Sequence, residues 1–239
     1  MKYPGWNLQE YAVVTSTNLL AADLPLWTAV RADSQTMGRG RFQRTWVSDL
    51  GGLWLSAVVP CEGKATRATL PLAAGVAVCD VLKELGLPAV RMRWPNDVLV
   101  GDRKLAGLLI DQFVSGRAVV GIGLNVRNQP ELHDPLLVNK TARLADFMFS
   151  PPELPVLTGL LLERLLQVVI ELEEQGPSAV ISRVNHLWGP RREVELDLDG
   201  KSRRGMFTGV DAQGRLAISD TGGEPFFYEA HEVRHLTET

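Results

Sequence analysis

The sequence predicts an α+β protein with a larger domain over residues 1–188 and a small all-β domain over residues 189–239. Residues 69–86 and 155–174 are long and apolar enough for helices, and β-rich segments lie between them. After Gly189-Pro190 the pattern changes to short alternating strands separated by turn residues. A chain of 239 residues can hold one large domain and one small domain.

Composition narrows the functional classes. Hydrophobic residues make up 45% of the chain and charged residues 22%, as in an ordinary soluble globular protein. The net charge of −3 argues against broad nucleic-acid binding. Cys61 and Cys79 fit no metal-binding or disulfide pattern. The N-terminus does not resemble a signal peptide and no apolar run reaches membrane-spanning length, so we expect a cytoplasmic protein without a membrane partner.

The first element is a short β-like segment from Tyr11 that leads into Ser16, Thr17 and Asn18. The Leu-Leu-Ala-Ala run that follows indicates a helix start. Two interpretations stand: the three polar side chains cap this helix, or they bind the polar edge of a small molecule. Residues 27–31 are expected to form a buried strand that leads into the next loop.

That loop reads Ser-Gln-Thr-Met-Gly-Arg-Gly-Arg-Phe-Gln-Arg-Thr-Trp over residues 34–46. Its glycines allow close approach of the backbone to a ligand. Its arginines are fork-shaped donors that suit phosphate and carboxylate oxygens. The loop therefore predicts a polyanion site, and the alternative is a solvated turn that binds nothing.

Residues 52–60 are rich in β-formers and predict a core strand, and residues 69–86 predict a helix. We expect Thr69 to cap this helix and Gly86 with Pro88 to end it.

The next segment, residues 90–111, predicts a strand, a Trp-Pro-Asn-Asp break, a hairpin turn and a second strand. The break leaves Asn96 and Asp97 where their side chains can face a pocket. Lys104 begins the second strand, where a lysine either lies along the edge or points into a site. Gly107 allows a ligand to approach the backbone.

Residues 118–126 predict another strand, in which Gly121 and Gly123 indicate either space for a ligand or a bulge, and Asn125 lies near its end. Residues 128–152 are loop-rich with a short helix near 141–147, and helices are expected over 155–174 and 178–188. Beyond them, alternating residues and hairpin turns predict a small β-barrel over about 190–239.

Taken in order, several of these motifs resemble the biotin–protein ligases. They are Ser16-Thr17-Asn18, Gly38-Arg-Gly-Arg41 with Arg44 and Trp46, Arg93-Trp-Pro-Asn-Asp97, Lys104-Leu-Ala-Gly107 and Gly121-Ile-Gly-Leu-Asn125. The resemblance implies a mixed β-sheet catalytic domain flanked by helices, of the class II synthetase and biotinyl/lipoyl ligase type, with a C-terminal SH3-like barrel. It implies an enzyme that joins biotin and ATP to biotinyl-5′-AMP and pyrophosphate, with Mg²⁺. Biotin then passes to one lysine of a biotin carboxyl carrier domain.

The resemblance also assigns roles to residues. Lys104, Arg39 and Arg41 correspond to catalytic residues, and Asp97 is a candidate for contact with a Mg²⁺ held mainly by substrate phosphates. The residues that correspond to biotin binding are Ser16, Thr17, Asn18, Gln35, Gly38, Arg39, Lys104 and Gly107. Those that correspond to nucleotide binding are Arg41, Arg44, Trp46, Asn96, Asp97 and Asn125.

Two departures from the family pattern matter. Arg93 stands where a lysine commonly precedes Trp-Pro-Asn-Asp, which keeps the charge and changes its geometry. About fifteen residues precede Ser16, too few for the DNA-binding domain of regulatory members, so we expect a ligase without repressor function. The resemblance allows a homodimer and does not identify the carrier or the residues that contact adenine.

Two other functions compete with this one. A lipoate–protein ligase shares the chemistry, but its usual Arg-Arg…Gly-Gly-Gly loop is replaced here by Gly-Arg-Gly-Arg. A biotin-responsive regulator or scaffold is a binding module, and the acidic balance disfavours it.

Overall fold

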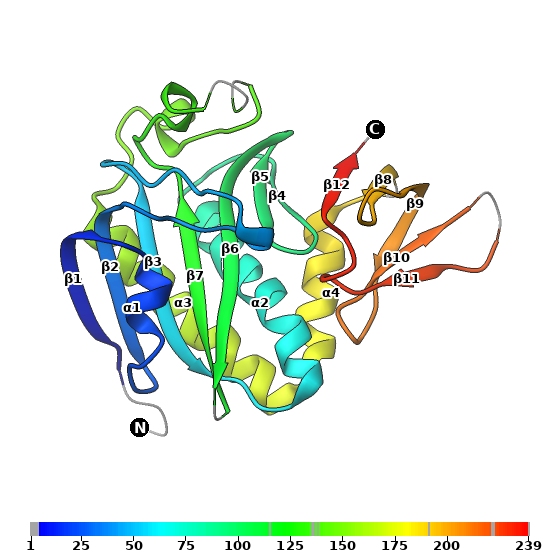
Figure 1. Cartoon of the computed structure of the whole chain (residues 1–239), viewed down its shortest axis with the longest axis horizontal. Helices are drawn as coiled ribbons and strands as arrows, with labels where there is room; N and C mark the ends of the chain where they lie inside the picture. Colours follow the sequence, from blue (N-terminus) through cyan, green and yellow to red (C-terminus); the bar gives the residue numbers. More distant parts are fainter. Residues whose placement is uncertain are drawn as a thin grey trace.

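The structure is a computed structural model that describes residues 5–114, 116–134, 137, 139–190, 192–220 and 223–238. Its centre is a seven-stranded sheet in the order β1-β2-β3-β7-β6-β5-β4 (Figure 1). Because β1 and β2 pair in parallel and the other neighbours pair antiparallel, the predicted mixed sheet is confirmed. The strands are β1 Asn7–Val14, β2 Thr28–Gln35, β3 Leu53–Pro60, β4 Val90–Arg93, β5 Asp97–Val100, β6 Arg103–Val114 and β7 Arg117–Leu124.

Helices cover both faces of this sheet (Figure 1). The short α1, Thr17–Ala21, lies on one face, and α2, Gly63–Glu84, and α3, Leu154–Gln175, lie on the other. Part of α2, Ala65–Glu84, is long and apolar enough to span a membrane by composition, but 67% of its apolar window is buried inside the protein. We therefore interpret α2 as the core helix of the fold.

A second sheet of five strands follows, in the order β11-β10-β9-β8-β12. Its strands are β8 Glu193–Asp197, β9 Ser202–Val210, β10 Leu216–Ser219, β11 Phe226–Tyr228 and β12 His235–Glu238. The predicted all-β region is thus confirmed. Within the described part of the chain the strand pairing leaves this sheet open, so closure into an SH3-like barrel stays a prediction.

Helix α4, Pro177–Trp188, lies between the two sheets and contacts β4 and β9 (Figure 1). The indole of Trp188 stacks on Phe207 with ring centroids 3.9 Å apart. The indole of Trp94 donates a hydrogen bond of 2.9 Å to the carbonyl of Gly214. One cluster of buried hydrophobic residues therefore continues from the first sheet into the second.

Two local predictions are wrong. Helix α2 begins at Gly63 rather than at Thr69, whose hydroxyl lies inside the helix and donates to the carbonyl of Ala65. The segment 90–100 is not one interrupted strand: the chain reverses at Trp94–Pro95, and β4 and β5 pair antiparallel with Arg93 opposite Asp97. The predicted end of α2 is confirmed, because Gly86 takes the left-handed φ of +82°.

Three 3₁₀ turns whose bounds lie within the described residues occur in the connections. They are Arg41–Gln43 in the arginine loop, Pro130–Leu132, and Leu144–Asp146, which is the short helix predicted near 141–147.

Candidate active site

A cavity of about 340 Å³ opens where the arginine loop crosses β6 and β7, a volume within the range of small-molecule sites. Lys104 and Arg39 line this same cavity, and Gly38 is the single predicted site residue that does not. A Cβ at Gly38 would lie 2.3 Å from both Ser48 Oγ and the carbonyl of Trp46, so this glycine allows the loop to pack closely on itself. The predicted residues that line the cavity are Ser16, Thr17, Asn18, Gln35, Arg39, Arg41, Arg44, Trp46, Asn96, Asp97, Lys104, Gly107 and Asn125.

One wall of the cavity is a polar network between α1 and the sheet. Gln35 Oε1 accepts hydrogen bonds from the backbone N–H of Thr17 at 2.8 Å and from its hydroxyl at 3.1 Å. The buried hydroxyl of Ser56 lies 2.7 Å from Thr17 Oγ1 and 2.6 Å from Asn18 Oδ1. The structure gives Ser16 no side-chain hydrogen bond that caps α1, so the capping interpretation of this motif is wrong.

The floor of the cavity is made by glycines of β6 and β7. A Cβ at Gly107 would lie 2.9 Å from the Trp46 ring, and one at Gly123 would lie 2.5 Å from Trp46 Nε1. The Lys104 ammonium lies 5.0 Å from the centroid of the same ring. A side chain at position 107 would therefore meet the indole of Trp46, and approach of a ligand to this glycine stays a prediction.

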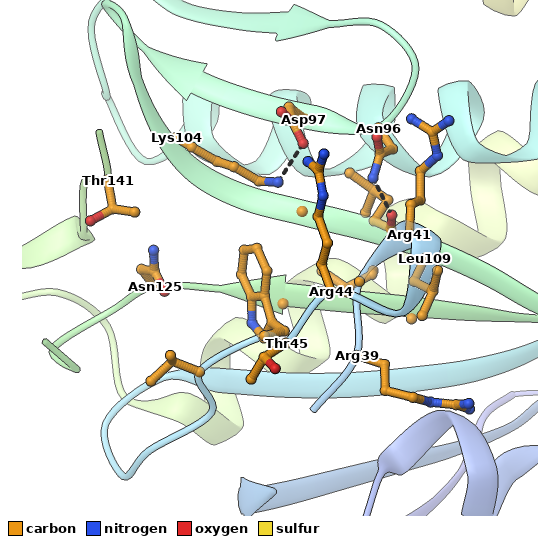
Figure 2. A pocket seen from close by; sticks show the side chains of 18 of the residues that line it. Arg39, Arg41, Arg44, Thr45, Asn96, Asp97, Lys104, Leu109, Asn125 and Thr141 are labelled. Carbon is orange, nitrogen blue, oxygen red and sulfur yellow. Dashed lines mark hydrogen bonds and ion pairs between the residues drawn. The ribbon is translucent and has the colours of Figure 1, made fainter. Parts of the chain in front are cut away.

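A charged cluster stands at the start of β5 and β6. Lys104 Nζ lies 2.5 Å from Asp97 Oδ1 (Figure 2). Arg93 donates to Asp97 Oδ2 at 2.8 Å. Burial raises the pKa of Asp97, but Lys104 and Arg93 outweigh it and hold the pKa below its usual value. Asp97 is therefore a carboxylate at neutral pH, and Arg93 acts here as its second cationic partner.

Figure 2 shows the side chain of Arg39 pointing away from those of Arg41 and Arg44. Arg39 pairs with Asp111 on β6 at 3.3 Å, away from the Lys104–Asp97 pair. Arg41 donates to the carbonyls of Ala230 and Val233 in the connection between β11 and β12, the latter at 3.0 Å. Burial lowers the pKa of Arg41 to about 10, which Asp97 partly offsets, so its guanidinium stays charged at neutral pH.

The second sheet contributes residues that the sequence did not indicate. Val233, Arg234, His235 and Leu236 line the same cavity as Lys104. Burial, followed by the charges of Arg44 and Arg93, lowers the pKa of His235. Val233 and Arg234 lie just before β12, and His235 and Leu236 are its first two residues. This segment carries no motif, and pairing of β12 with β8 is what places it.

Asparagine side chains hold the loops around the cavity. Asn96 Nδ2 donates to the carbonyl of Leu108 at 2.7 Å (Figure 2). Asn125 Nδ2 donates to the carbonyl of Ala142 at 3.1 Å, and its Oδ1 accepts from Asn128 Nδ2 at 3.0 Å. Asn96 therefore ties the turn before β5 to β6, and Asn125 ties the end of β7 to Ala142 and Asn128.

A magnesium ion is implied by the resemblance and can be tested against these side chains. Among the residues that the structure describes, no group of three or more His, Cys, Asp or Glu side chains could hold a metal ion. Asp97 already contacts two cations. A protein-built Mg²⁺ site does not fit this donor set, because Mg²⁺ requires several oxygen ligands in near-octahedral geometry.

The fold and the cavity define a small-molecule-binding α+β protein with a cationic loop over its site. Residues 11–126 match the family model of the biotin/lipoate A/B protein ligases. The biotin–[acetyl-CoA-carboxylase] ligase of Mycobacterium tuberculosis is 34% identical over 249 residues, which cover 97% of this chain and 90% of that protein. The bifunctional ligase/repressor BirA of Escherichia coli is 32% identical over 235 residues, covering 91% of this chain and 71% of that protein.

The chain belongs to the biotin/lipoate A/B protein ligase family. Among solved structures, it is similar to the biotin protein ligase from Aquifex aeolicus in complex with biotin and ATP. That similarity has a TM-score of 0.86 and 25% identity, and it covers 98% of this chain and 99% of the other.

Proposed function

We propose that this protein is a biotin–protein ligase. It joins the carboxylate of biotin to the α-phosphate of ATP, which gives biotinyl-5′-AMP and releases pyrophosphate. It then transfers biotin to a lysine of a biotin carboxyl carrier domain and releases AMP. The observation that carries this proposal is one cavity that brings together Lys104, the arginine loop and the polar wall of α1.

The first step brings two anions together, so cationic side chains must offset their repulsion. We assign Lys104 to the point where the carboxylate meets the α-phosphate. In the first step a carboxylate oxygen bonds to the α-phosphorus, and the bond to the β-phosphate breaks. Arg39 and Arg41 then stabilise the charge that develops on the phosphates and on the departing pyrophosphate.

We assign the two ends of the cavity to the two substrates. The wall that contains Ser16, Thr17, Asn18 and Gln35 takes the polar ring of biotin, near Gly107. The side that contains Arg44, Trp46, Asn96, Asp97 and Asn125 takes the nucleotide. The described residues provide no protein cage for Mg²⁺, so we propose that the ion enters with the phosphates of ATP, and we route no step through it.

In the second step the carrier's lysine amine attacks the carbonyl of the mixed anhydride, and the bond to AMP breaks. The anhydride is already activated, so no covalent enzyme intermediate is required. The arginine loop must exclude water from the anhydride until the carrier docks. This role requires the loop to move, because the carrier lysine has to reach the same carbonyl.

The direct test is incubation of the protein with biotin, ATP and Mg²⁺, with pyrophosphate release and bound biotinyl-AMP measured by mass spectrometry. Lipoate replaces biotin in a parallel sample, and a carboxylase carrier domain is added in a third. We expect pyrophosphate and the adenylate with biotin, little of either with lipoate, and biotin on one carrier lysine. Equal turnover of lipoate, or no pyrophosphate with either acid, would overturn the assignment.

Three further proposals accompany this function. We propose that residues 1–188 are the catalytic domain and residues 189–239 the C-terminal domain.

A cytoplasmic location is supported by Cys61 and Cys79, which are free and buried. A homodimer is supported by β1, an edge strand that exposes Leu8 and Val13, and sedimentation of the purified protein would test it.

A further inference from the structure

The loop of residues 38–46 contacts the second sheet through two adjacent side chains, Arg41 and Phe42. The guanidinium of Arg41 donates to the carbonyls of Ala230 and Val233, which are separated from it by 189 and 192 residues along the chain. The guanidinium of Arg234 lies 5.4 Å from the centroid of the Phe42 ring. Both contacts join the proposed catalytic loop to the segment 229–234 just before β12.

The backbone of the loop is unusual at the same place. Phe42 has φ 55° and ψ 36°, and Gln43 has φ 59°, so two successive residues with side chains take the left-handed conformation. Such residues visit this region rarely, because the Cβ crowds the following carbonyl. A conformation of this kind persists where surrounding contacts hold it. Here backbone hydrogen bonds within the loop, such as that from Gly40 to Arg44, act together with the contacts of Arg41 and Phe42 to the segment 229–234.

The segment 229–234 is itself held in place. Arg234 Nε pairs with Asp199 Oδ1 at 2.7 Å, and the backbone N–H of Arg234 donates to the carbonyl of Asp197 at 2.8 Å. Phe42 and Arg234 line a second cavity of about 320 Å³, together with Leu198, Asp199, Tyr228, His231 and Glu232. The Phe42 ring is therefore an exposed side chain of the loop, and it packs against Arg234 of the segment 229–234.

We propose that the segment 229–234 is a latch for the arginine loop. The latch holds Arg41 on two backbone carbonyls and competes for its guanidinium with the anionic oxygens of the nucleotide. The existence of the latch is inferred from the contacts alone. The identity of the competing ligand, a nucleotide, rests on the proposed function. Opening and closing of the loop is then governed from the second sheet.

The latch can be weakened without changing the residues assigned to the chemistry. Phe42→Ala and Arg234→Met each remove one side of the ring contact. Arg203→Met is the matched control: Arg203 also belongs to the second sheet, lies 4.4 Å from the Phe226 ring and pairs with Asp220, so it resembles Arg234 without touching the loop. Amide hydrogen exchange of residues 39–46 in buffer alone is the measurement.

We expect exchange in this loop to increase about two- to fivefold in Phe42→Ala and in Arg234→Met, the range that one partly exposed cation–π contact gives. The double variant should add little to Arg234→Met, because that variant has already lost the ring contact together with the pair to Asp199. Arg203→Met should match the unchanged protein. If the loop exchanges equally in all five proteins, the latch does not exist.

Addition of ATP distinguishes competition from simple stabilisation. If phosphates take Arg41 from the carbonyls, exchange must slow in residues 39–46 and quicken in residues 229–234. Slower exchange on both sides would overturn the competition. Should ATP change neither side, the proposed function fails, whereas the comparison of variants in buffer still decides whether the latch exists.

Discussion

The ammonium of Lys104 lies 2.5 Å from the carboxylate of Asp97, across the β5–β6 hairpin. The hairpin register shifts by a bulge between Val98 and Leu99, which places Lys104 opposite Leu99 and Asp97 opposite Gly107. Since Arg93 contacts the other oxygen of Asp97, one carboxylate orients two cations at the edge of the cavity. The charge available to a bound anion is therefore set by three residues together.

Replacement of Lys104 by alanine should remove the cation at the proposed meeting point of the two substrates. We expect the fold to be retained and biotin-dependent ATP–pyrophosphate exchange to fall by about 10²–10³, by analogy with the loss of one oxyanion donor. Lys201→Ala, on the exposed surface of the second sheet, is the control and should leave exchange unchanged. Full exchange in the Lys104 variant would remove this residue from the chemistry.

Replacement of Asp97 by asparagine should leave Lys104 and Arg93 close together without their shared counter-ion. We expect the free energy of unfolding at pH 7 to fall by about 2–3 kcal/mol, somewhat less than for a fully buried pair. The pKa of Asp97 is lowered in the folded protein, so its stabilisation is present above about pH 4 and is lost as the pH falls further. Denaturant unfolding at pH 7 and pH 3 measures both effects, and a gap as wide at pH 3 as at pH 7 contradicts the assignment.

Replacement of Gly107 by alanine should force a methyl group against the Trp46 ring, because its Cβ would lie 2.9 Å from a ring carbon. We expect a loss of about 1–3 kcal/mol in the free energy of unfolding and weaker ATP binding by calorimetry. In a Trp46→Ala background the same change should cost less, since the ring is absent. Gly159→Ala, in α3 with nothing within 4 Å of its added Cβ, should be neutral or slightly stabilising.

Replacement of Glu238 by glutamine should loosen the second sheet from the first. Glu238 is mostly buried, accepts hydrogen bonds from Arg91 of β4 and from the indole of Trp188, and has a lowered pKa because these contacts outweigh its burial. We expect a loss of about 1–3 kcal/mol at pH 7. Because the pKa of Glu238 is lowered in the folded protein, the loss should begin to shrink below the ordinary pKa of a glutamate and vanish once the folded carboxyl group is protonated.

Thermal unfolding at pH 7 and pH 3 measures this effect. Glu195→Gln serves as the control, because the exposed Glu195 pairs with Arg204 within the second sheet and bridges no other element. Equal melting temperatures for Glu238→Gln and the unchanged protein at pH 7 would contradict the role given to Glu238.

Much of the fold follows from local pattern. The β-formers of residues 52–60 predict β3, and the Gly86 and Pro88 pair predicts the end of α2. The start of α2 was misplaced because Thr69-Leu-Pro71 imitates a cap followed by a proline in the first turn, whereas Pro71 lies inside the helix. Strand β12 was missed, since four residues with a single buried side chain give no periodic signal and gain their structure by pairing with β8.

In the candidate site too, residues within short motifs could be predicted, and contacts between distant parts of the chain could not. The motifs around Arg39, Asp97 and Lys104 are readable because each lies within a short segment, and these residues do line one cavity. The contacts of Arg41 could not be read in this way, because its partners are backbone carbonyls far along the chain. Any residue type supplies a carbonyl, so such a partner leaves no trace in the sequence.

The stacking of Trp188 on Phe207 affects how this protein can exchange parts with its relatives. A chimaera that takes its last fifty or so residues from another family member would keep Trp188 of this chain and replace the surface that contains Phe207. Recombination at the border would then succeed where both aromatic surfaces are replaced together. The C-terminal sheet and helix α4 should therefore be exchanged together, as one unit.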